Sequence, residues 1–147
     1  MMRLWVLVAV LGVALAGCQL NREARADPLE FALDQEFVLS GGQEAAIRGE
    51  NLVLRFSEVR EDSRCPTQVE CVWSGQARIA LAVRPPVGEP TTVTFTTSPA
   101  PSQDNLTAEV GGGYTIWLRA LDPYPQTTAA IPFQDYRATL AARKRAP

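Results

Sequence analysis

The chain has 147 residues, of which 46% are hydrophobic and 20% are charged, a composition typical of a globular protein. Its formal net charge is only −2, so a nucleic-acid partner, which requires a clustered basic surface, is not expected. The sequence contains no histidine, which excludes Ser-His-Asp and Cys-His catalysis and every histidine-ligated metal site. These properties argue against an enzyme, and we predict no catalytic residue, no metal and no cofactor.

The first segment has the pattern of a bacterial lipoprotein signal peptide. One positive charge, Arg3, precedes an apolar run over residues 4–14, which is too short to cross a bilayer because a spanning helix needs about 20 residues. Residues 15–18, Leu-Ala-Gly-Cys, resemble the lipobox at which such a leader is cleaved and the cysteine is lipidated. We predict a signal peptide over residues 1–17 and a lipid on Cys18. The alternative is an ordinary secretory peptide with an incidental cysteine.

A lipid on Cys18 is expected to anchor the protein to a membrane. Each buried methylene contributes about 0.8 kcal/mol, so several acyl chains hold a protein firmly where one chain is marginal. Gln19 follows the cysteine where an aspartate favours inner-membrane retention in bacterial lipoproteins. We therefore expect the outer membrane, facing the periplasm, if the cell has two membranes. Residues 18–30 form a mostly polar tether of at most about 40 Å when extended.

After the tether, apolar residues alternate with polar ones, which is the pattern of a half-buried β-strand. The first alternating residues are Phe37 and Leu39, then Ala45 and Ile47, then Leu52, Leu54 and Phe56. Turn signals at residues 41–42 and 49–51 separate these runs. The pattern slips before Val59, which predicts a bulge or a strand end there.

The second half of the chain continues the same alternation. Its strands are marked by Ala77, Ile79, Leu81 and Val83, then Val93 and Phe95, then Tyr114, Ile116 and Leu118, and finally residues 131–140. A proline-rich stretch over residues 84–90 ends the first of these strands, because proline cannot donate to a β-ladder. A loop over 98–105, a glycine turn at 111–113 and a break at 122–125 separate the others.

The most distinctive segment is the loop between residues 61 and 75, which contains two cysteines. With Cys18 assigned to lipid, Cys65 and Cys71 remain, and an exported compartment permits a disulfide between them. A closed loop of about seven residues contributes on the order of 2.4 kcal/mol in the chain-entropy model. The cysteines lie further apart than the pair of a redox motif, so we predict a structural bridge. Trp73 is expected to pack against it.

Four residues in and near this loop form a candidate interaction loop: Asp62, Arg64, Trp73 and Tyr124. The guanidinium of Arg64 can bind a carboxylate through two parallel hydrogen bonds, like the two prongs of a fork, and the side chain of Asp62 is suited to cap the turn. Tyr124 lies between two prolines and is a candidate recognition residue, although an aromatic that covers a sheet edge is the favoured alternative.

Several carboxylates surround the cysteines, namely Glu58, Glu61, Asp62 and Glu70. A calcium ion takes roughly six to eight oxygen ligands, and the spacing of these residues matches no calcium-binding loop. A solvated acidic rim that includes Arg60 and Arg64 is therefore favoured over a metal site.

The cysteine loop resembles the signature of a family of small bacterial secreted lipoproteins. The family pattern is Asp-Ser-Arg-Cys-Pro, followed by a second cysteine, an aromatic residue and a glycine. In this chain the pattern is matched by residues 62–66, Cys71, Trp73 and Gly75. Residues 121–125, Leu-Asp-Pro-Tyr-Pro, match a later Leu-x-Pro-Tyr-Pro motif. The resemblance implies a small β domain with a disulfide, and it implies no activity.

About seven short strands joined by turns predict one all-β domain, an immunoglobulin-like antiparallel β-sandwich over residues 31–142. A small β-barrel is the alternative. Residues 143–147 contain three consecutive basic side chains and are predicted to be a solvated, charged tail.

The function indicated is that of a lipid-anchored, non-catalytic accessory or binding module of the bacterial cell envelope, with the membrane and an envelope protein as partners. Its working surface is expected around the Cys65–Cys71 loop and Tyr124. The alternative is an inhibitor that presents the loop to an envelope hydrolase, because a stapled loop loses little entropy on binding. An enzyme using a carboxylate pair such as Glu61 and Glu70 is disfavoured, since nothing in the spacing shows that they face each other.

Overall fold

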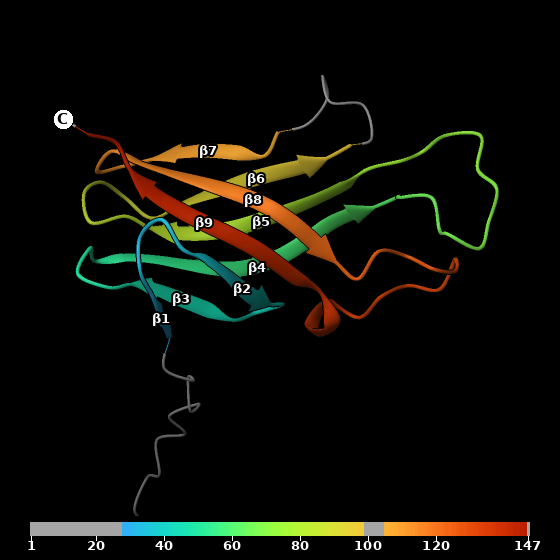
Figure 1. Ribbon diagram of the computed structural model, residues 1–147, viewed down its shortest axis with the longest axis horizontal. Coiled ribbons are helices and arrows are strands. Elements are labelled where there is room, and N and C mark those ends of the chain that lie inside the picture. The colour runs from blue at the N-terminus through green and yellow to red at the C-terminus, as the bar shows by residue number, and fades with distance from the viewer. Residues whose placement is uncertain (1–27, 99–104, 147) are drawn as a thin grey trace, which may run out of the picture.

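The computed structural model describes residues 28–98 and 105–146. These residues form two β-sheets that do not close into a barrel (Figure 1). The strands are β1 (Leu29–Phe31), β2 (Glu36–Ser40), β3 (Glu44–Ile47), β4 (Leu52–Asp62), β5 (Ala77–Arg84), β6 (Thr91–Thr97), β7 (Thr107–Val110), β8 (Tyr114–Asp122) and β9 (Arg137–Lys144). A short 3-10 helix, Phe133–Asp135, precedes β9. The leader and Cys18 lie outside the described residues, as do residues 99–104 of the predicted 98–105 loop.

The two sheets lie face to face. One has the strand order β1-β3-β4-β5-β6 and the other the order β2-β9-β8-β7. Figure 1 shows the second sheet crossing in front of the first. β1 pairs with β3 in parallel, and the other pairings between these strands are antiparallel. The arrangement is consistent with the predicted sandwich and differs from the barrel alternative.

The core lies between the sheets, and the predicted alternation explains it. Leu52, Leu54 and Phe56 of β4 are fully buried and face Ile116 and Leu140 of the opposite sheet within one hydrophobic cluster. Burial of such side chains is the main favourable term in folding. The slip in the pattern before Val59 is a genuine irregularity, because the β4–β5 register shifts twice, between Phe56/Glu58 and between Val59/Glu61.

The structure differs from the sequence prediction at both ends of the domain. β1 begins at Leu29, within the predicted tether, and β9 continues to Lys144, beyond the predicted end at residue 142. Arg143 and Lys144 therefore belong to the sheet rather than to a solvated tail. Their charges are compensated, because Arg143 lies 2.6 Å from Asp34 and Lys144 lies 2.8 Å from Glu50.

A membrane-spanning helix is not found within residues 28–98 and 105–146: no helix there has the length and apolarity that crossing a bilayer requires.

Candidate functional site

The cysteine loop joins β4 to β5 and is held at its base by backbone hydrogen bonds. Ser63 N–H donates to the carbonyl of Gln76 over 2.8 Å, and Cys65 N–H donates to the carbonyl of Ser74 over 3.1 Å. The predicted disulfide is confirmed: Cys65 and Cys71 are bonded, with their Cα atoms 5.9 Å apart. The two chain ends thus run side by side into a covalently closed tip.

Gly75 is required by this close approach. Its φ of +63° lies in the left-handed region, and a Cβ at this position would fall 1.7 Å from the carbonyl oxygen of Ser63. The glycine of the sequence motif therefore permits the backbone pairing at the base of the loop.

A second attachment joins the loop to the segment that follows β8. Thr67 N–H donates to the carbonyl of Pro125 over 3.1 Å, and Gln68 N–H donates to the carbonyl of Gln126 over 3.0 Å. The two motif segments recognised in the sequence, residues 62–66 and 121–125, are thus neighbours in space. The loop is held from the side as well as at its base.

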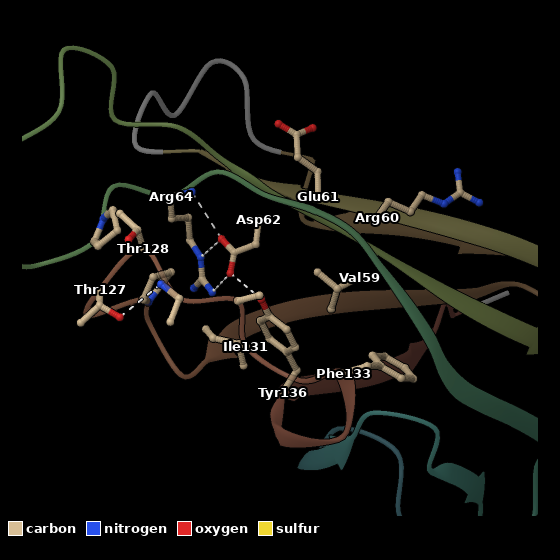
Figure 2. A pocket seen from close by; sticks show the side chains of 14 residues that line it. Val59, Arg60, Glu61, Asp62, Arg64, Thr127, Thr128, Ile131, Phe133 and Tyr136 are labelled. Atoms are coloured by element: carbon tan, nitrogen blue, oxygen red, sulfur yellow. Dashed lines mark hydrogen bonds and ion pairs between the residues drawn. The ribbon is translucent and has the colours of Figure 1, made fainter. Parts of the chain in front are cut away.

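Arg64 joins the two motif segments through its buried side chain. Its Nε and Nη2 donate to Oδ1 and Oδ2 of Asp62, each over 2.7 Å, which is the predicted fork onto a carboxylate (Figure 2). Nη1 donates to the carbonyl of Leu121 over 2.9 Å, and Nη2 donates to that of Pro123 over 3.0 Å. The guanidinium also lies 5.0 Å from the ring centroid of Tyr124. Asp62 and Arg64 therefore have the structural role that the sequence predicted.

Asp62 accepts further hydrogen bonds that complete this cluster. The backbone N–H of Arg64 donates to Oδ1 over 3.3 Å, which is the predicted turn cap, and Tyr136 donates its hydroxyl to Oδ2 over 2.8 Å. We call Asp62, Arg64 and Tyr136 the Arg64 clamp. Because Asp62 ends β4 and Tyr136 directly precedes β9, the clamp joins one sheet to the other. Tyr136 was not predicted from the sequence.

The protonation equilibria of the clamp reflect its burial and hydrogen bonds. Burial acts to raise the pKa of Asp62, but hydrogen bonds from Arg64 and Tyr136, with the positive charge of Arg64, lower it below the ordinary value of 3.8. Burial, reinforced by the hydrogen bond to Asp62, raises the pKa of Tyr136 to about 12. The clamp is therefore fully formed around neutral pH, with Asp62 ionised and Tyr136 neutral.

We expect the Arg64 clamp to make folding stability sensitive to acid. A carboxyl group whose pKa is lower in the folded state contributes stability above its unfolded pKa of about 4, and this contribution is lost as the pH falls through the folded-state pKa. As the pH is lowered from neutral to about 2, the urea concentration at the unfolding midpoint should fall less steeply for Asp62→Asn than for the wild type. An acid dependence that is unchanged by this substitution would contradict the role of Asp62.

A similar arrangement joins the sheets at the other end of β4. Glu50, in the turn before β4, accepts hydrogen bonds from the Tyr114 hydroxyl and, over 2.8 Å, from Lys144 Nζ. These two hydrogen bonds lower the pKa of Glu50. Tyr114 belongs to β8 and Lys144 to β9, so β4 is tied to the opposite sheet at each of its ends. This second carboxylate belongs to the scaffold and lies away from the cysteine loop.

A groove of about 410 Å³ lies beside the Arg64 clamp (Figure 2). Its walls include Val59 and Glu61 of β4 on one side and Thr127, Ile131 and Phe133 on the other. Within the part of the chain that the structure describes, no three His, Cys, Asp or Glu side chains gather as metal ligands would. Among those residues, the groove therefore contains no preformed set of metal ligands.

The carboxylates that the sequence offered as calcium ligands are mostly engaged with arginines. Glu58 lies 3.3 Å from Arg60, and Glu61 lies 3.9 Å from Arg78. Asp62 belongs to the Arg64 clamp, so Arg64 is a buried structural group rather than part of a solvated rim. These pairs account for three of the four acidic residues near the loop, and Glu70 is the fourth.

The end of the cysteine loop presents apolar side chains to solvent. Val72 is 92% exposed and Trp73 is 82% exposed, and Val69 is exposed as well. The expectation that Trp73 packs against the disulfide is wrong, because an indole ring with this exposure buries little of its surface against any neighbour. We call Val69, Val72 and Trp73 the loop tip. Tyr124, also exposed, lies at the base of the loop over Arg64.

No family model matches the chain, and neither a curated protein nor a solved structure is significantly similar to it. The functional interpretation therefore depends on the geometry of this chain.

Proposed function

We propose that the protein is a lipid-anchored, non-catalytic binding module of the bacterial cell envelope, which docks to its partner through the loop tip. The observation that carries the proposal is the exposure of Val72 and Trp73, which directly follow the disulfide-bonded Cys71 in the cysteine loop. Large apolar side chains that are exposed to solvent on the surface of a protein commonly mark an interaction surface. We also propose that the two sheets form an immunoglobulin-like sandwich, which serves as the scaffold for this loop.

The physical properties of the loop suit recognition. Tryptophan is among the residues that contribute most to protein–protein binding, because it buries a large area with few rotatable bonds. The Cys65–Cys71 bridge, the base hydrogen bonds and the Arg64 clamp restrict the loop before binding. A restricted loop loses less conformational entropy on docking, so more of the contact energy remains as affinity.

The anchor places this surface close to a membrane. With a lipid on Cys18 and a tether that ends before β1 at Leu29, the domain remains within about 40 Å of the bilayer. We propose the outer membrane, facing the periplasm, as the location in a cell with two membranes. The partner is then a component of the same compartment.

We expect growth with a palmitate analogue to label the wild-type protein and not the Cys18→Ala variant. The variant lacks the thiol that accepts the lipid, so it should also leave the membrane fraction and become soluble after cell lysis. The measurement is gel fluorescence of the labelled protein after fractionation. A wild type that remains unlabelled would overturn the proposed anchor, whereas the docking proposal would still stand.

A second candidate function is inhibition of an envelope hydrolase, and the exposure of a disulfide-closed loop specifically favours it. In this case Val72 and Trp73 would enter the substrate cleft of the enzyme. Purified protein should then slow peptidoglycan or peptide hydrolysis by an envelope extract, and Trp73→Ala should abolish the effect. Equal hydrolysis with and without the protein would exclude this function while leaving a non-inhibitory binding module intact.

The docking proposal is tested by crosslinking in whole cells. A photocrosslinking amino acid at position 69 of the loop tip should convert the otherwise wild-type protein into a discrete larger species, and this species should be reduced at least about tenfold in Trp73→Ala, the scale of a binding hot spot. Val87→Ala is the matched control, because Val87 is an exposed apolar residue in the β5–β6 turn, at the opposite end of the molecule from the cysteine loop (Figure 1). Equal crosslinking in the two variants would contradict docking through the loop tip.

A further inference from the structure

A hollow lies beside the loop tip and is lined mainly by apolar surface. Its volume is about 360 Å³, and its lining includes Leu106, Leu121 and the ring of Tyr124, with Ser74 at the loop side and Arg119 of β8. This volume is near the lower end of the range for small-ligand pockets, roughly 300–1,000 Å³, so one indole ring can enter. Because Ser74 directly follows Trp73 in the chain, the protruding tip and the hollow lie at the same end of the domain.

The tip cannot fill the hollow of its own chain in this structure. Trp73 is 82% exposed, and its loop is held by the disulfide and by the hydrogen bonds of Thr67 and Gln68 to the segment after β8. These attachments fix the direction in which the tip projects. The tip of the same chain is therefore not the occupant of the hollow.

The tip and the hollow carry opposite charges. Glu70 is the charged residue between the two cysteines, and among residues 28–98 and 105–146 no side chain forms an ion pair or hydrogen bond with it. Arg119 of the hollow is half exposed and lies 3.6 Å from the exposed Glu36, a loose surface contact that contributes little. A molecule that brings an acidic, apolar tip to the hollow therefore matches both its apolar lining and its cation.

We propose that the occupant is a second copy of this chain, so that the loop tip of each copy docks into the hollow of the other. This inference rests on the proposed function, in which the tip is a docking surface, and it names the partner. A two-fold dimer needs one surface patch that is complementary to itself, and a tip beside a hollow of opposite charge is such a patch. Trp73 would meet Leu106 and Leu121 of the second copy, and Glu70 would meet its Arg119.

The expected dimer forms weakly in solution and more readily on a membrane. A tip-and-hollow contact buries less area than the roughly 1,200–2,000 Å² of a stable interface, even when it occurs twice. Anchoring both copies in one bilayer raises their effective concentration, which favours association without any new contact. Self-association should therefore depend strongly on protein concentration.

Sedimentation equilibrium of the mature chain carrying Cys18→Ala, from micromolar to millimolar concentration, tests the dimer. We expect a monomer–dimer equilibrium that Trp73→Ala weakens at least about tenfold, as truncation of a central aromatic does. Val87→Ala should leave it unchanged. Near-ultraviolet circular dichroism and the melting temperature establish that each variant is folded. A wild-type chain that is monomeric at every concentration would overturn the inference.

Charge exchange provides an independent test of the contact. Glu70→Arg and Arg119→Glu should each weaken the dimer, because each places like charges opposite one another, and the double variant should restore it. If both single variants weaken the dimer and the double variant does not restore it, the proposed pairing of Glu70 with Arg119 is contradicted.

The sedimentation result also separates this inference from the proposed function. A monomeric chain whose tip still crosslinks to a different protein in whole cells refutes the second copy as occupant and supports the binding module. A monomeric chain with no tip-dependent crosslink refutes both. A crosslinked species that contains two copies of the chain, and that Trp73→Ala removes, supports both.

Discussion

Replacing Arg64 with methionine is expected to lower the free energy of unfolding by about 3–5 kcal/mol, the usual loss when one partner of a buried ion pair is removed. The side chains of Arg64 and Asp62 are only 7% and 8% exposed, so the variant leaves a carboxylate buried without its cation. The carbonyl oxygens of Leu121 and Pro123 also lose their donors. Chemical denaturation at neutral pH measures this loss.

Arg60→Met is the matched control, because Arg60 lies near the end of β4, shortly before Arg64 in the chain, and also pairs with an acidic residue. Its side chain is 46% exposed, and its contact with Glu58 is 3.3 Å, so its removal should cost less than about 1 kcal/mol. Removing both charges of the clamp in Arg64→Met with Asp62→Leu should recover part of the loss, because no charge then remains buried and unpaired. Similar losses in the Arg64 and Arg60 variants would contradict the assignment of Arg64 as the link between the two motif segments.

Replacing both Cys65 and Cys71 with serine is expected to destabilise the domain by about 2.4 kcal/mol, as the chain-entropy model gives for a loop of about seven residues. The bridge restricts the unfolded chain, and its two cysteines are not members of the hydrophobic core between the sheets. The variant should therefore keep the fold of the sheets and unfold at a lower denaturant concentration with a similar slope.

The same variant should lose affinity for its partner beyond what its stability explains. Without the bridge, Val72 and Trp73 remain in the sequence, but their loop has more conformations to lose on docking. Crosslinking yield in whole cells should therefore fall even where circular dichroism shows a folded domain. Unchanged stability and unchanged crosslinking would together exclude a structural role for the disulfide.

The sequence predicted the long strands well because their burial has a clear period. Leu52, Leu54 and Phe56 alternate with less buried neighbours, as do Tyr114, Ile116 and Leu118 of β8. In β5 the same alternation holds except that Ala80 is also buried. β1 and β7 were not predicted, because β1 contains no fully buried residue and β7 contains only Val110. Neither strand therefore shows the alternation that marks the equally short β3, in which Ala45 and Ile47 are buried. The end of β9 was misjudged because Arg143 and Lys144 resemble a solvated tail until their acidic partners, distant in sequence, are known.

The contacts of the candidate site were predictable where the interacting residues lie close together in the sequence. A carboxylate partner for Arg64 and a turn cap by Asp62 followed from residue type, and the structure shows that these two residues, two positions apart, bind each other. Tyr136 lies 74 residues from Asp62, and no sequence pattern links a tyrosine to such a partner. Trp73 was misplaced because a loop has no periodicity to show which side chains face the core.

The central claim, that the loop tip is the docking surface, is tested most directly by a photocrosslinking amino acid placed at single positions in living cells. Val72 is the test position, and Val87, which is 66% exposed at the opposite end of the domain, is the control. Illumination should produce a discrete crosslinked product from position 72 and none from position 87. Absence of any product from position 72, or the same product from both positions, would contradict the claim.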